Sequence, residues 1–130
     1  MKIWTIANQK GGVGKTTTSI SLAGLLIERG FRVLMIDLDP HGSMTSYFGY
    51  DPDTIEESAY SLFEKKAAKN NIPLASILCH TDLEKLSLLP ASTSMVALDR
   101  HLGAQEGMGL VIKQTLKQYQ TYFDYVLIDC

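Results

Sequence analysis

A glycine-rich stretch at residues 10–17, with the sequence KGGVGKTT, constrains the fold of this chain more than any other feature. An apolar run of strand length, IWTIA at residues 3–7, precedes it, and residues 18–30 follow it with the apolar content of a buried helix. Glycines at positions 11, 12 and 14 allow a tight turn whose N–H groups face an anion. A strand, a glycine-rich turn and a helix in this order predict a phosphate-binding loop, and a nucleotide is the expected ligand.

The residues of this loop have separate expected roles. A helix that starts near Lys15 adds its free N-terminal donors and the positive end of its dipole. Lys15 is placed to reach the β and γ phosphates, and the Thr16 hydroxyl is placed to bind Mg²⁺. The nucleotide-binding residues are therefore expected to be Gly11, Gly12, Val13, Gly14, Lys15, Thr16 and Thr17.

A second apolar strand brings two acids toward this loop. Residues 33–36, VLMI, form a continuous apolar run, typical of strands inside parallel sheets, which is followed by Asp37 and Asp39. A strand–helix–strand unit is right-handed, and both strands direct their carboxyl ends to the same edge of the sheet. Ligands bind at that edge, so Asp37 and Asp39 are expected beside the phosphate loop. Because they lie two apart on one extended segment, both side chains are expected on one face.

The rest of the chain continues the α/β alternation. Further helices are expected at residues 43–48, 55–69, 72–78, 95–102 and 108–119, and a third strand is expected at residues 86–89. The last segment, FDYVLIDC at residues 123–130, is an apolar strand closed by Asp129. An acid at the carboxyl end of such a strand holds Mg²⁺ directly or through water.

Two departures from the common phosphate-loop pattern identify a family resemblance. Gln9 replaces the first glycine of that pattern, and Lys10 adds a second lysine. This form resembles the deviant Walker A motif of the ParA/MinD family of dimeric ATPases, and the final DYVLIDC resembles the family's Walker B segment. The resemblance implies a SIMIBI-type P-loop NTPase, an α/β fold with a parallel sheet flanked by helices. In the family the chain continues well beyond that segment. Residues 1–130 are therefore expected to be the N-terminal part of one ATPase domain, truncated after the Walker B strand. The alternative is a natural minimal domain.

The resemblance also implies roles for individual residues. Lys10 would reach across a nucleotide-sandwich dimer to the partner's γ-phosphate and, with Lys15 and Asp39, make up the catalytic set. Asp37 would support the water shell of Mg²⁺, and Asp39 would position the attacking water. Asp129 would be the distal Mg²⁺ partner, so that Thr16, Asp37 and Asp129 form the expected metal site.

His41 and Ser43 differ from the glutamine and asparagine that the family usually carries after its D-x-D-P segment. A lone histidine in a loop is more often a hydrogen-bonding residue than a catalyst. The alternative is that the change marks a subgroup of ParA-like proteins that position chemosensory arrays or other cargo.

Composition excludes several other functions. The net charge is −2, with 12 basic and 14 acidic residues dispersed along the chain, so no electrostatic footprint for nucleic acid is visible. The two cysteines are too few for a disulfide framework or a zinc site and fit a reduced cytoplasmic interior. The N-terminal apolar run is too short for a signal peptide, and no run of ~18 apolar residues predicts a membrane span.

The expected function is that of a ParA-like ATPase, which binds and slowly hydrolyses ATP with Mg²⁺, dimerises on ATP and positions DNA or another cargo. The implied partners are a ParB-like or cargo-adaptor activator and nonspecific DNA, the latter through the absent C-terminal half, which implies a cytoplasmic, nucleoid-associated protein. A MinD-like membrane-associated regulator and a nitrogenase-iron-protein or metal-cluster-carrier ATPase are the alternatives. A plain nucleotide kinase is less favoured, because Lys10 has no role there.

Overall fold

The computed structural model describes residues 1–6, 13–67, 73–96 and 105–130. The described strands are β1 (Lys2–Ile6), β2 (Val33–Asp37), β3 (Cys79–His80), β4 (Leu86–Leu89) and β5 (Tyr125–Asp129). The α-helices are α1 (Val13–Glu28), α2 (Ser43–Tyr47), α3 (Ala59–Ala67) and α5 (Gln105–Leu116), and two 3₁₀ turns, η1 (Leu74–Ser76) and η2 (Lys117–Tyr119), complete the described elements. None of these helices combines the length and the apolar content that crossing a membrane requires.

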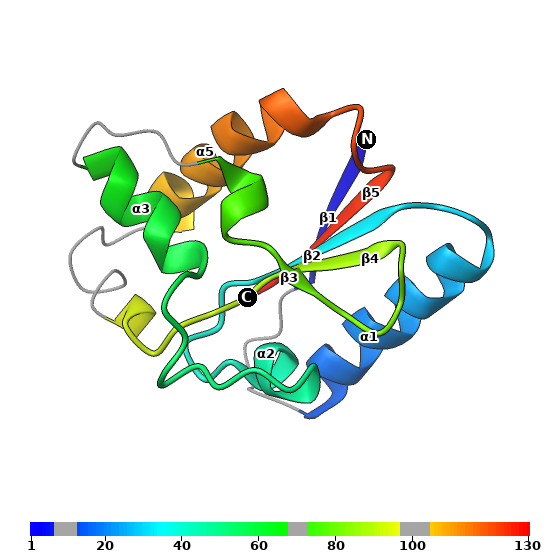
Figure 1. The fold of residues 1–130 in the computed structure, drawn as a ribbon, viewed down its shortest axis with the longest axis horizontal. Helices are drawn as coiled ribbons and strands as arrows, with labels where there is room; N and C mark the ends of the chain where they lie inside the picture. The colour runs from blue at the N-terminus through cyan, green and yellow to red at the C-terminus, as the bar shows by residue number, and fades with distance from the viewer. Residues whose placement is uncertain (7–12, 68–72, 97–104) are drawn as a thin grey trace.

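The strands form one sheet in the order β1-β5-β2-β4-β3 (Figure 1). β1, β5, β2 and β4 run parallel, which confirms the predicted α/β fold with a mainly parallel sheet. In the register, Asp129 at the end of β5 lies opposite Ile6 of β1 on one side and Asp37 of β2 on the other. The carboxyl ends of these three strands therefore meet at one edge.

Helices cover both faces of the sheet, with α1 on one side and α3 and α5 on the other (Figure 1). Successive residues of β2 point to opposite faces, so Met35 packs in the cluster with α1 while Leu34 and Ile36 pack in the cluster with α3 and α5. All five residues of β2 are buried. Its unbroken apolar sequence follows from this central position, because a strand covered on both faces needs no polar alternation.

β3 was not predicted, and it makes the edge of the sheet mixed rather than wholly parallel. The segment expected to be helical at residues 72–78 contains only the 3₁₀ turn Leu74–Ser76 within its described part. Cys79 and His80 then pair antiparallel with β4, and the Tyr50 hydroxyl donates to the His80 carbonyl at 2.7 Å. Two residues are too few to show a strand period, so only this tertiary contact and the pairing reveal the strand.

Two helix boundaries also differ from the expectation. α3 begins at Ala59 rather than at residue 55, because residues 51–55 form a turn in which the Ile55 amide donates to the Asp51 carbonyl at 2.9 Å. The Ser58 hydroxyl accepts from the Tyr60 amide at 3.1 Å, a contact typical of a helix start. α5 begins at Gln105, before residue 108. Residues 97–104, which include most of the helix expected at 95–102, lie outside the described residues.

Candidate functional site

The predicted phosphate loop is described only in its second half. Lys10, Gly11 and Gly12 lie outside the described residues, and so do the side chains of Val13 and Lys15. α1 begins at Val13, so the helix start predicted near Lys15 falls two residues earlier. The first turn of this helix carries main-chain N–H groups without intrahelical acceptors, which is the feature that favours an anion.

Thr16 in this first turn contacts the end of β5. Its Oγ1 donates to Oδ2 of Asp129 at 3.4 Å, across 113 positions of sequence. Asp129 is buried and lies opposite Asp37 in the pairing of β5 with β2. The structure thus brings together all three residues that were expected to serve Mg²⁺.

Asp37 is fully buried and is held by three hydrogen bonds. Its Oδ1 accepts from the Asp39 amide at 3.1 Å. Its Oδ2 accepts from the Thr45 amide at 3.0 Å and from the Thr45 hydroxyl at 2.7 Å. The Thr45 oxygen in turn accepts from the Ala91 amide at 2.8 Å. One hydroxyl therefore joins the end of β2, the helix α2 and the segment that follows β4.

Burial raises the pKa of Asp37 from 3.8 to about 6, because desolvation disfavours the charged form. Hydrogen bonds from Thr45 and Asp39 oppose this shift, and the nearby charge of Asp129 adds to it. The site therefore holds two buried carboxyl groups on neighbouring strands. A cation near them would relieve their mutual repulsion.

These oxygen atoms suit Mg²⁺ in kind, since this ion prefers hydroxyl, carboxylate and water oxygens. Both oxygens of Asp37 already accept hydrogen bonds from the protein, so this carboxylate fits a place in the water shell of the ion. Thr16 and Asp129 lie closer to the first turn of α1, where phosphate is expected. Within the part of the chain that the structure describes, no cluster of three His, Cys, Asp or Glu side chains offers a different metal site.

Asp39 has a different environment from Asp37. β2 ends at Asp37, and Asp39 lies two residues beyond it. The Asp39 side chain is 22% exposed. Its Oδ1 accepts from the His41 amide at 3.0 Å and lies 3.0 Å from His41 Nδ1.

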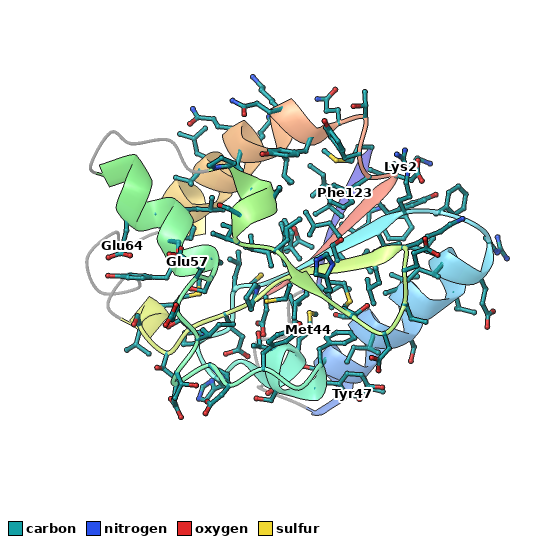
Figure 2. All side chains as sticks on the ribbon, in the orientation of Figure 1. Lys2, Met44, Tyr47, Glu57, Glu64 and Phe123 are labelled. Carbon is teal, nitrogen blue, oxygen red and sulfur yellow. The ribbon has the colours of Figure 1, made fainter. Side chains whose placement is uncertain are left out.

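The turn between these acids and α2 depends on a glycine. Gly42 has φ 64° and ψ 35°, in the left-handed region, and it precedes the first residue of α2. A Cβ at this position would lie 2.3 Å from Cγ of Pro52. Met44 of α2 is buried and Tyr47 points outward (Figure 2), so this short helix is fixed against the sheet on one side only.

Sequence reasoning missed Thr45, Ala91 and the role of Gly42. The helix at residues 43–48 was predicted and is confirmed as Ser43–Tyr47. A threonine in a five-residue helix gives no signal of its own, because its partners lie 8 and 46 positions away. The glycine was visible in the sequence, but its close approach to Pro52 was not.

Comparisons with known proteins find similarity over the whole chain. A family model described as an AAA domain matches residues 1–130. The sporulation initiation inhibitor protein Soj of Bacillus subtilis is 35% identical over 129 residues, which are 99% of this chain and 49% of that protein. The chain therefore spans about half the length of this relative.

Solved structures show the same coverage. Cobyrinic acid a,c-diamide synthase from Mycobacterium smegmatis, with bound ADP and magnesium, superimposes with a TM-score of 0.85 at 36% identity. The match covers 100% of this chain and 51% of the synthase chain. The ATP complex of a Cyanothece McdA variant superimposes with a TM-score of 0.79 at 30% identity, over 99% of this chain and 47% of its own.

Proposed function

We propose, from the premise that this chain belongs to the ParA/MinD family of P-loop ATPases, that it forms the N-terminal part of a domain that binds ATP with Mg²⁺ and hydrolyses it slowly. The observation that carries the proposal is the meeting of Thr16 with Asp129, opposite Asp37, at the carboxyl edge of the sheet. That edge is where parallel α/β sheets bind their ligands.

In this proposal different groups at the ligand edge bind the phosphates and the metal ion. The first turn of α1 and Lys15 supply positive charge for the phosphates, and charge-assisted hydrogen bonds of this kind are worth about 1.5–3 kcal/mol each. Thr16 and Asp129 would hold Mg²⁺, with Asp37 accepting from the water around it. Bound Mg²⁺ would neutralise charge on the β and γ phosphates.

Asp39 is the residue that we propose for positioning the attacking water. It follows β2 at the ligand edge and is partly exposed, whereas Asp37 is buried and committed to Thr45. Phosphoryl transfer depends mainly on positioning and electrostatics, so a single carboxylate near the γ-phosphate is sufficient for slow turnover.

The cellular role that we propose is the ATP-dependent positioning or partitioning of DNA or another cargo. Two relatives that are 34–35% identical to this chain are named chromosome-partitioning proteins, and their names support this role. ATP would join two copies, with Lys10 of each contacting the nucleotide of the other, and a ParB-like or cargo-adaptor protein would trigger hydrolysis in the cytoplasm. Residues 1–130 carry a net charge of −2, so we assign binding of nucleoid DNA to segments beyond them.

Two lysine substitutions in the complete protein test the proposed binding mode. Lys15→Ala should abolish ATP binding, because the loop loses the charge that faces the β and γ phosphates. Lys10→Ala should keep nucleotide affinity and lose ATP-dependent dimerisation. Titration calorimetry and size-exclusion chromatography measure the two properties, and an equal loss of affinity in both variants would contradict the role of Lys10 across the dimer.

A third substitution, Asp39→Ala, should trap an ATP-bound dimer, because the binding contacts remain while the water is no longer positioned. Size-exclusion chromatography with ATP and a phosphate-release assay measure this. A variant that stays monomeric and hydrolyses ATP at the parent rate would refute the assignment of Asp39.

A further inference from the structure

The segment His41-Gly42-Ser43 is not used by the proposed function, although it lies shortly after the end of β2 and contacts Asp39. We propose that His41 is a positioning residue that acts through Asp39. Its Nδ1–H donates to Asp39 Oδ1 and holds the carboxylate in the orientation that aligns the attacking water. This inference rests on the proposed role of Asp39 and adds a residue to it.

Two donors from one residue converge on a single oxygen of Asp39. The main-chain N–H of His41 lies 3.0 Å from Oδ1, and Nδ1 of its ring lies 3.0 Å from the same atom. The main-chain contact is a common turn and would exist with almost any residue at position 41. The ring contact requires a side chain with a donor at the position of Nδ1. It restricts the rotation of the carboxylate, and both contacts are made to Oδ1 rather than to Oδ2.

The backbone that carries His41 is fixed from both sides. The Gly42 amide donates to the Asp39 carbonyl at 2.8 Å, and Gly42 is pressed against Pro52. On the other side Thr45 anchors α2 to Asp37. His41 therefore stands on a short, well-anchored turn, and its ring meets Asp39 without help from packing, since the side chain is 89% exposed.

This exposure argues against a purely structural role. An exposed ion pair or hydrogen bond contributes little to folding stability. The contact therefore contributes little to folding stability. A displacement of the Asp39 carboxylate by a few tenths of an ångström, or its rotation by several degrees, would however misplace the attacking water. Substitution of His41 should consequently leave the fold intact and change hydrolysis.

The test compares His41→Ala and His41→Asn in the complete protein by steady-state ATP hydrolysis. Loss of one oriented hydrogen bond in the alanine variant should lower kcat roughly two- to tenfold with KM and the thermal melting temperature unchanged. Asparagine carries an N–H donor near the position of Nδ1, so this variant should restore kcat to about the parent value if the donor to Asp39 is what matters.

The outcomes separate this inference from the proposed function. An alanine variant with the parent kcat, in a protein that Asp39→Ala inactivates, would overturn the role of His41 alone. An asparagine variant that is as slow as the alanine variant would overturn the role of the side-chain donor at this position. A protein that hydrolyses ATP equally well after Asp39→Ala would instead overturn the proposed function on which the inference rests.

Discussion

Replacing Thr45 by valine, which keeps the shape of the side chain and removes its hydroxyl, should destabilise the folded protein by about 3 kcal/mol. The hydroxyl donates to Asp37 Oδ2 at 2.7 Å and accepts from the Ala91 amide at 2.8 Å, and Thr45 is fully buried. Valine satisfies neither partner. The loss should appear in the protein without nucleotide, because both partners belong to the fold itself.

The magnitude follows from the two partners of the hydroxyl. A hydrogen bond to a charged acceptor such as Asp37 is worth about 1.5–3 kcal/mol, and a buried N–H left without an acceptor, here that of Ala91, costs about 1–3 kcal/mol. The additional methyl group offsets about 1 kcal/mol of this. The net loss is a large part of the total stability of about 5–15 kcal/mol that is usual for a folded protein.

Urea unfolding at equilibrium measures this loss, with Thr45→Ser as the matched control. Serine keeps the hydroxyl and removes one methyl group, so it should cost about 1 kcal/mol. Both variants should unfold with the parent's dependence on urea, which shows that the midpoint reports stability. A valine variant within about 0.5 kcal/mol of the serine variant would refute the reasoning, because the hydroxyl would then contribute nothing beyond its packing.

Two further predictions concern the same region. Gly42→Ala should cost more than about 2 kcal/mol, because φ is 64° and the new Cβ would lie 2.3 Å from Pro52. Gly49→Ala, with φ 90° and open space around it, should cost about 1 kcal/mol; equal shifts in urea midpoint would contradict the steric argument. Folding raises the pKa of Asp37 from 3.8 to about 6, so the folded state binds this proton more tightly than the unfolded state. The protonated carboxyl therefore adds about 3 kcal/mol to the free energy of unfolding below pH 3.8, and this contribution is lost as the pH rises through about 6. Asp37→Asn should remove this fall, and parallel stability curves for the parent and the variant from about pH 4 to 7 would refute it.

The parts of the site that sequence reasoning located correctly are those set by local chemistry and chain direction. The apolar run before Asp37 predicts a buried parallel strand, and the run that ends in Asp129 predicts another. Because parallel strands direct their carboxyl ends to one edge, the two acids had to approach the helix that carries Thr16, and they do. No contact needed to be known in advance for that conclusion.

The fold was predictable to the same degree. The short helix Ser43–Tyr47, the strand Leu86–Leu89 and the last strand all lie where sequence reasoning placed them. The pattern could not give the order of the strands, in which β5 lies between β1 and β2. It also could not give the two-residue strand β3 or the late start of α3 at Ala59, since each depends on partners elsewhere in the chain.

The detailed environment of the acids was decided only by the tertiary structure. Asp37 and Asp39 are two residues apart, yet one is buried against Thr45 and the other is partly exposed beside His41. This difference arises because α2 folds back onto the end of β2, and Ala91 arrives from the end of β4 to complete the contact. Burial, and with it the raised pKa of Asp37, depends on which segments pack around a residue, and no pattern of neighbours along the chain contains that information.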